Sequence, residues 1–182
     1  ENAFIGILVG ALFTAIIQSS SASVGILQAL ALSGVITLPS AIYVLFGQNI
    51  GTCITSVLAS IGTGRNAKRT TILHLAFNVI GTVIFVAVSM VTPFASFMAS
   101  LTPANVPAQI ANVHTVFNVV TTILLLPFGE KLVQLTYKIL PEKPDLEDSM
   151  RLKYLDFSIF TNDYHVGTSA IANTQLFNET QN

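Results

Sequence analysis

The sequence predicts an all-α membrane protein built from a re-entrant helical hairpin, one broken transmembrane helix and two full transmembrane helices. Only 9% of its 182 residues are charged, whereas soluble domains carry about 25%. Two blocks, residues 2–64 and 70–129, contain no Asp, Glu, Lys or Arg, and one short basic segment separates them. Uncharged apolar blocks of this length are typical of membrane-spanning segments.

The first element, residues 3–33, is apolar except for Gln18-Ser19-Ser20-Ser21 at its centre. One membrane crossing takes about 20 residues, so this stretch is too short to cross twice. A single crossing would place the polar residues at mid-depth. We therefore predict a re-entrant hairpin with arms 3–17 and 22–33 and a polar tip at 18–21, because irregular backbone at membrane depth needs surrounding protein or a cavity.

Small residues recur every four positions on each arm, which predicts that both arms pack closely against other helices. They are Gly6, Gly10, Thr14 and Gln18 on the first arm, and Ser21, Gly25, Ala29 and Ser33 on the second. The alternative is a single tilted span with ordinary small-residue packing.

The next helix is expected at 39–61, with Pro39 in its first turn. Two glycines flank two amides within Gly47-Gln48-Asn49-Ile50-Gly51-Thr52, and since glycine weakens helices we expect a break there. After the basic loop 62–69, full spans are expected at 70–91 and 107–127. The connecting segment 92–106 is expected to be an external loop.

A short amphipathic stretch, 130–140, ends the predicted transmembrane part, residues 1–140. A charged and polar tail, 141–182, follows, which we expect to be soluble. The basic loop is expected to be cytoplasmic by the positive-inside tendency. Two crossings then return the chain to the same side, where Lys131 and Lys138 lie, so the tail is also expected to be cytoplasmic.

Two polar groups inside the apolar blocks are candidate binding sites. The tip, Gln18 to Ser21, offers hydroxyls, an amide and the unpaired N–H groups of a helix start, which suit an oxyanion. The second group offers oxygens, which hard cations such as sodium prefer: Gln48, Asn49, Thr52 and Thr55. The alternatives are a polar turn in a kinked helix, and threonines that donate back to their own helix.

A motif, His-x-x-Phe-Asn, occurs twice at a spacing of 40 residues, as His74 with Asn78 and as His114 with Asn118. Each pair falls on one helix face. These residues either line a pathway or, as we favour, join helices by hydrogen bonds. Repeats and discontinuous helices are features of secondary transporters.

Several function classes are disfavoured by what the sequence lacks. No carboxylate lies in the predicted spans, which disfavours proton coupling and favours sodium as the coupling ion. A serine hydrolase is disfavoured because no acid is available to orient His74 or His114. With a net charge of −1, the sequence gives no indication of a basic stripe that would bind nucleic acid. We expect no enzymatic activity and no cofactor other than the coupling ion.

Two segments together resemble the type II sodium–phosphate cotransporter family: Gln18-Ser-Ser-Ser-Ala22 and Gly47-Gln-Asn-Ile-Gly-Thr52. Asn66-Ala-Lys-Arg69 and the two His-x-x-Phe-Asn motifs resemble its bacterial branch. The resemblance covers residues 1–140. It implies two inverted repeats, phosphate bound between the two hairpin tips, and sodium ions nearby. On that pattern phosphate would bind Gln18, Ser19, Ser20 and Ser21, and sodium would bind Gln48, Asn49, Thr52 and Thr55.

The chain has one Gln-Ser-Ser-Ser, and its Gly-Gln-Asn-Ile-Gly-Thr variant resembles the second repeat. The resemblance therefore implies the C-terminal half of a sodium-coupled phosphate symporter of the bacterial inner membrane. Its partner would be the missing N-terminal repeat or a second, inverted copy. Gln48 and Cys53-Ile54 depart from the vertebrate pattern, which leaves the sodium stoichiometry open. Other interpretations are a non-transporting phosphate sensor or scaffold, a symporter of another oxyanion, and a channel.

Overall fold

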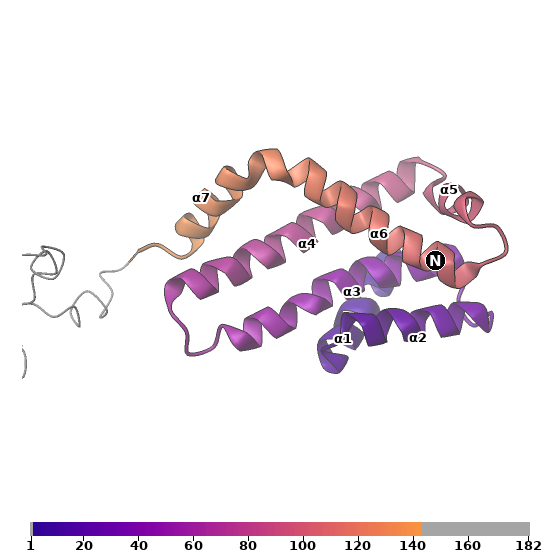
Figure 1. The fold of residues 1–182 in the computed structure, drawn as a ribbon, viewed down its shortest axis with the longest axis horizontal. Helices are drawn as coiled ribbons and strands as arrows, with labels where there is room; N and C mark the ends of the chain where they lie inside the picture. Colours follow the sequence, from indigo (N-terminus) through magenta and orange to yellow (C-terminus); the bar gives the residue numbers. More distant parts are fainter. Residues whose placement is uncertain (1, 143–182) are drawn as a thin grey trace, which may run out of the picture. The chain divides into compact units, whose positions relative to one another are not determined.

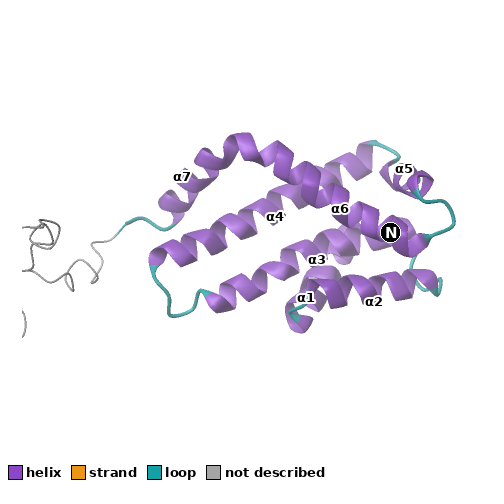
Figure 2. Ribbon diagram, in the orientation of Figure 1, coloured by secondary structure: helices purple, strands orange, loops and turns teal. Residues whose placement is uncertain are grey.

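A computed structural model describes residues 2–142, which form a bundle of helices joined by short loops (Figures 1 and 2). No β-strand occurs in that range. Apart from Pro141 and Glu142, the predicted tail lies outside the described residues. In chain order the elements are α1 Ala3–Ile17, α2 Ser20–Leu32, α3 Leu38–Ala59, α4 Arg65–Val91, α5 Phe94–Leu101, α6 Val106–Leu125, the 3-10 helix η1 Leu126–Phe128 and α7 Gly129–Ile139.

Three helical segments are long and apolar enough to cross a membrane: Leu38–Ala59, Arg65–Val91 and Val106–Ile139. They match the helix predicted at 39–61, which ends two residues earlier than predicted, and contain both predicted full spans. Helices α1 and α2 have 15 and 13 residues, fewer than the roughly 20 that a crossing needs. The two helical arms of the hairpin are thus confirmed, whereas their re-entrant placement in a bilayer stays a prediction.

The hairpin turns at Gln18 and Ser19. The backbone of Gln18 lies in the left-handed region, with φ 58°. An α-helix needs right-handed backbone angles, so α1 ends there. The Ser19 hydroxyl then accepts a hydrogen bond from the Ala22 N–H at 3.3 Å and caps α2. The turn is shorter than the predicted tip, since Ser20 and Ser21 already form the first turn of α2.

The predicted break at 47–52 is wrong, because α3 runs without interruption from Leu38 to Ala59. The glycines serve close packing instead. A Cβ on Gly47 would overlap the Ile7 carbonyl, and one on Gly51 would overlap the Ala11 carbonyl. Small residues allow two helix backbones to touch in this way, so α1 and α3 lie against each other.

The small-residue rows behave differently on the two arms. On α1, Gly10 and Thr14 are buried against α3, as predicted. The predicted row on α2 is wrong, since all four of its members are exposed. They are Ser21, Gly25, Ala29 and Ser33. Helix α2 instead buries the face that carries Ser23, Leu27 and Ala31.

Four phenylalanines from four helices form the centre of the core. The rings of Phe46, Phe85 and Phe117 lie 5.1–5.9 Å apart, and Phe94 of α5 lies 5.8 Å from Phe85. The predicted loop 92–106 is therefore wrong over α5, where Phe94 and Met98 fall four apart on one buried face.

The basic end of α4 contacts the end of α7. Helix α4 begins at Arg65, so most of the predicted basic loop is helical. Arg69 donates to the Leu140 carbonyl at 3.1 Å and its guanidinium lies 3.9 Å from the Tyr137 ring centroid. Figure 1 shows the start of α4 and the end of α7 at the same end of the bundle. This agrees with the two predicted crossings between them.

Candidate functional site

A polar pocket of about 300 Å³ lies where α2, α3, α4 and α6 meet. Its lining consists of hydroxyls, amides, imidazoles and one aromatic ring, and among residues 2–142 it includes no Asp, Glu, Lys or Arg. The lining residues are Ser20, Asn49, Thr52, His74, Phe77, Asn78, His114 and Asn118. Half of the predicted sodium group (Asn49 and Thr52) and both His/Asn pairs thus converge with Ser20, a residue of the predicted tip.

The aromatic core fixes the helices that carry this lining. Asn49 follows buried Phe46 by three positions on α3, and His114 precedes buried Phe117 by three positions on α6. Such spacings put each pair on neighbouring turns of one face. The pocket is therefore built on packed helices, which hold side chains in place better than loops do.

The hairpin turn contributes one of its four predicted phosphate ligands to the pocket. Ser20, the first residue of α2, is part of the lining. Gln18, Ser19 and Ser21 are exposed and lie outside it. Their position follows from the turn, because Gln18 closes α1 and the Ser19 hydroxyl caps α2.

The predicted sodium ligands are split by the continuous α3. Asn49 and Thr52 line the pocket. Gln48 points to α2, where its Nε2 donates to the Ser23 carbonyl at 3.0 Å. Thr55 is exposed and donates to the Thr52 carbonyl at 3.0 Å. Adjacent residues of a helix point about 100° apart, so an unbroken α3 cannot aim Gln48 and Asn49 at one site.

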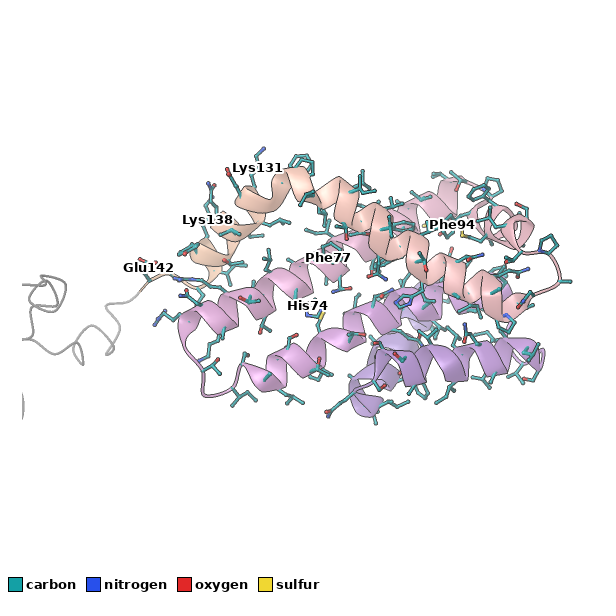
Figure 3. All side chains as sticks on the ribbon, viewed as in Figure 1. His74, Phe77, Phe94, Lys131, Lys138 and Glu142 are labelled. Atoms are coloured by element: carbon teal, nitrogen blue, oxygen red, sulfur yellow. The ribbon has the colours of Figure 1, made fainter. Side chains whose placement is uncertain are left out.

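His74 and Asn78 bridge α4 to α3. The His74 Nδ1 lies 2.9 Å from the Ser56 hydroxyl, and the Asn78 Nδ2 donates to the Cys53 sulfur at 3.4 Å. Figure 3 shows the His74 side chain between these helices. The pair on α4 therefore has the helix-joining role that the sequence favoured, while it also lines the pocket.

The second pair makes no such bridge. The Asn118 Nδ2 donates to the His114 carbonyl within α6 at 2.8 Å. No hydrogen bond joins the His114 ring to any other residue of the range 2–142. His114 and Asn118 both line the pocket, and neither the His114 ring nor the Asn118 amide oxygen has a hydrogen-bond partner in that range.

Neutral polar groups make the pocket suitable for an anion together with a cation. Hydroxyl, amide and imidazole N–H and O–H groups can donate to anionic oxygens, while amide and hydroxyl oxygens can accept from or coordinate a cation. Across residues 2–142 no group of three or more His, Cys, Asp or Glu side chains gathers. The side-chain oxygens that line the pocket belong to amides and hydroxyls, and such neutral oxygens suit a hard ion.

Phe77 is the lining residue that sequence reasoning missed. It belongs to the first His-x-x-Phe-Asn motif, and Figure 3 shows it on α4. The equivalent Phe117 is buried in the aromatic core instead. The repeated motif was a signal for both rings, but it could not tell which of them would reach the pocket.

Comparisons with known proteins agree on one family. A model of that family, described as Na+/Pi-cotransporter, matches residues 1–125. The chain is 42% identical over 142 residues to the uncharacterized protein YqeW of Bacillus subtilis. It is 27% identical over 154 residues to the Escherichia coli protein named "Putative inorganic phosphate export protein YjbB". It is 40% identical over 82 residues to the human sodium-dependent phosphate transport protein 2B.

The chain spans only part of the length of these relatives. The alignments cover 75%, 83% and 43% of the chain, but 44%, 27% and 12% of the Bacillus, Escherichia and human proteins respectively. No solved structure matches the chain.

Proposed function

The chain belongs to the Na+/Pi-cotransporter family, and from that premise we propose that it forms the C-terminal half of a sodium-coupled symporter for inorganic phosphate. The family consists of transporters, and three helices are able to cross a membrane, so the protein is an integral membrane protein. The observation that carries the proposal is the uncharged pocket that joins Ser20 at the hairpin turn to the two His/Asn pairs.

Phosphate is proposed to bind through neutral donors in this pocket. The Ser20 hydroxyl and the His114 ring can each donate to a phosphate oxygen, and so can the remaining N–H of the Asn118 amide. Hydrogen bonds to a charged partner are worth about 1.5–3 kcal/mol each. Donors without full positive charge hold phosphate less firmly than arginine or lysine would, which suits a carrier that must release it.

Sodium is proposed to enter the same pocket as the coupling ion. A phosphate anion placed among neutral groups, away from bulk water, leaves uncompensated charge, which is costly. Sodium ions coordinated by the side-chain oxygens of Asn49 and Thr52 would offset that charge. The Thr52 hydroxyl hydrogen is used toward the Gln48 carbonyl at 2.9 Å, so its lone pairs are turned outward. Anion and cation binding then favour each other, which is the basis of coupled transport.

The exposed turn is proposed to face the other half of the transport unit. Gln18, Ser19, Ser21 and Thr55 are exposed in this chain, and they would complete the phosphate and sodium sites only when a second hairpin tip approaches. That half would be an N-terminal repeat or a second, inverted copy. The partial coverage of the relatives supports a missing half, since the chain spans 44% of the Bacillus relative.

The proposed placement is the bacterial inner membrane with α1 and α2 re-entrant. Arg65, Lys68 and Arg69 lie at the end of the bundle where α7 ends, and basic residues favour the cytoplasmic side. The tail that follows α7 would then be cytoplasmic. Alternating access would come from movement of the α1–α2 hairpin relative to α4 and α6.

Phosphate export is the second candidate, because the YjbB relatives are named for it. Export would use the same pocket with the opposite net direction. A sensor or scaffold would bind phosphate in the pocket but show no flux, and a carrier of another oxyanion would prefer that anion in competition.

Two neighbouring serines provide the test of the proposed site. Ser20 lines the pocket, whereas Ser21, of the same chemistry and in the same helix turn, is exposed outside it. We expect Ser20→Ala in the full-length protein to lower radiolabelled phosphate uptake into proteoliposomes by about tenfold at subsaturating phosphate. Ser21→Ala should have a clearly smaller effect. Equal losses in both variants, or unchanged uptake in Ser20→Ala, would contradict the proposed site.

A further inference from the structure

A second hollow, an open groove of about 520 Å³, runs along α7. It shares no described lining residue with the polar pocket. Its lining combines two lysines with apolar side chains, and no carboxylate of residues 2–142 belongs to it. The lining residues are Phe128, Lys131, Leu132, Gln134, Leu135 and Lys138. Positive charge beside apolar surface suits a ligand that is itself both anionic and apolar.

Contacts with α4 determine which side of α7 is turned outward. Arg69 of α4 donates to the Leu140 carbonyl at 3.1 Å, and its guanidinium lies 3.9 Å from the Tyr137 ring centroid. Lys131 and Lys138 are exposed, and Figure 3 shows both on the side of α7 that faces away from α4. The groove therefore opens to the surroundings of the bundle.

The two lysines border a strip of exposed apolar side chains. Seven residues separate Lys131 from Lys138, so they lie two turns apart on one face. At about 100° per residue, three apolar side chains fall within about 40° of one another beside Lys131, while Gln134 and Glu130 fall on its other side. These three form the apolar strip: Phe128, Leu135 and Ile139, which are 49%, 40% and 57% exposed.

The lysine charges are not neutralised within the described part of the chain. The Lys131 ammonium lies 5.5 Å from the Phe128 ring centroid, at the edge of the apolar strip. Neither Lys131 nor Lys138 forms an ion pair with a carboxylate of residues 2–142. Both ammonium groups therefore have donors available for an anion in the groove.

The length of the last apolar segment places α7 outside the hydrocarbon core. Val106–Ile139 contains 34 residues and would measure about 51 Å as a straight helix, whereas the core is about 30 Å thick. Helix α6 alone, with 20 residues, is long enough to cross. Figure 1 shows α7 at an angle to α6, after η1. Lysines are costly inside the core, so α7 is the part that leaves it.

From these observations we infer that α7 lies in the membrane interface and that its groove binds the headgroup of an anionic phospholipid. Water disfavours the apolar strip and the hydrocarbon core disfavours the lysines, and an interfacial helix meets both demands. Lys131 and Lys138 donate to the headgroup phosphate, while the strip contacts the acyl chains. A zwitterionic lipid fits less well, because no described carboxylate lines the groove to pair with its cationic group. The inference goes beyond the proposed function and does not depend on it.

Native mass spectrometry of the full-length protein in detergent measures this binding. The protein is titrated with phosphatidylglycerol or with phosphatidylcholine of the same acyl chains, and bound lipid is counted. We expect tighter binding of phosphatidylglycerol. Lys131→Gln and Lys138→Gln should each weaken it about fivefold, since one basic residue near an anionic surface contributes about that factor. Binding of phosphatidylcholine should stay unchanged, and Lys138→Arg should retain the wild-type preference.

Lys68→Gln is the matched control. Lys68 is exposed near the start of α4 and lies outside the groove, so the variant removes the same charge without touching the proposed site. Its affinity for phosphatidylglycerol should stay within about twofold of the wild type. Glutamine and lysine have similar helix propensities, so all three glutamine variants should melt at the wild-type temperature.

Three results would overturn the lipid site. One is equal affinity for the two lipids, and another is a loss in Lys68→Gln as large as that in the groove variants. The third is displacement of phosphatidylglycerol by millimolar inorganic phosphate, because a bare ion has no acyl chains for the apolar strip. If the lipids bind equally and a carbodiimide cross-links Lys131 or Lys138 to carboxylates in residues 142–182, the groove holds an acidic segment of the chain instead. Phosphate uptake is a separate measurement, so the proposed function stands or falls independently.

Discussion

The two histidines of the pocket differ in how far the fold already uses them. His74 lies 2.9 Å from the Ser56 hydroxyl and links α4 to α3. The His114 ring makes no hydrogen bond to any other described residue. Both line the pocket, so the same motif provides one histidine that positions a helix and another that is available to a ligand.

This difference predicts opposite effects of two equivalent substitutions. His74→Ala should lower the free energy of unfolding by about 1 kcal/mol, because a hydrogen bond between helices is lost. His114→Ala should leave it within about 0.5 kcal/mol but reduce phosphate uptake by about tenfold. Thermal unfolding in detergent and uptake into proteoliposomes measure the two quantities. A destabilised His114→Ala with normal uptake would show that the assignment is reversed.

At the scale of elements, the contact between α1 and α3 depends on glycine. Gly10 of α1 and Gly47 and Gly51 of α3 lie where the backbones touch, and any Cβ there would overlap the facing carbonyl. This contact explains why α3 continues without a break through a segment whose glycines give it a weak helix propensity. Tertiary packing overrides local propensity here, and it holds Gln48 beside the hairpin.

Alanine substitutions test this role of glycine. Gly47→Ala should destabilise the protein by about 1–3 kcal/mol or prevent folding, because the Ile7 carbonyl occupies the space that its Cβ would need. The control is Gly25→Ala on α2, where no atom lies within 4 Å of the added Cβ. Gly25→Ala should stabilise the helix by about 0.5–1 kcal/mol. Similar melting temperatures for both variants would contradict the close contact.

Sequence reasoning located the helices better than their contacts. The hairpin turn at Gln18 and Ser19 and the spans α4 and α6 were predicted, because polar caps and long apolar runs are local signals. The continuity of α3 was not predicted, and neither was the exposure of the small-residue row of α2 that includes Gly25. Both depend on which helix lies opposite. Sequence motifs pointed to several pocket residues: Ser20, Asn49 and the His/Asn pairs. They did not show that Asn49 lines the pocket while Gln48 points to α2, because that follows from α3 being unbroken.

At the scale of the whole molecule, charge and apolar surface are segregated. Basic side chains of α4 and α7 gather at one end of the bundle, where Arg65 donates to the Pro141 carbonyl at 2.6 Å and Arg69 to that of Leu140. Elsewhere large apolar side chains remain exposed, including Phe4, Leu12 and Ile16 along α1. Lipid or a second half of the transport unit would cover such a surface, because water disfavours it.

The proposed coupling of phosphate to sodium in this pocket is tested most directly by one flux measurement. The full-length protein is reconstituted into liposomes with equal phosphate on both sides and an inward sodium gradient, with the membrane potential clamped. If sodium drives phosphate through this pocket, labelled phosphate should accumulate above equilibrium inside the vesicles. Reversing the sodium gradient should reverse the net movement. Phosphate flux that stays the same when potassium replaces sodium would contradict sodium coupling.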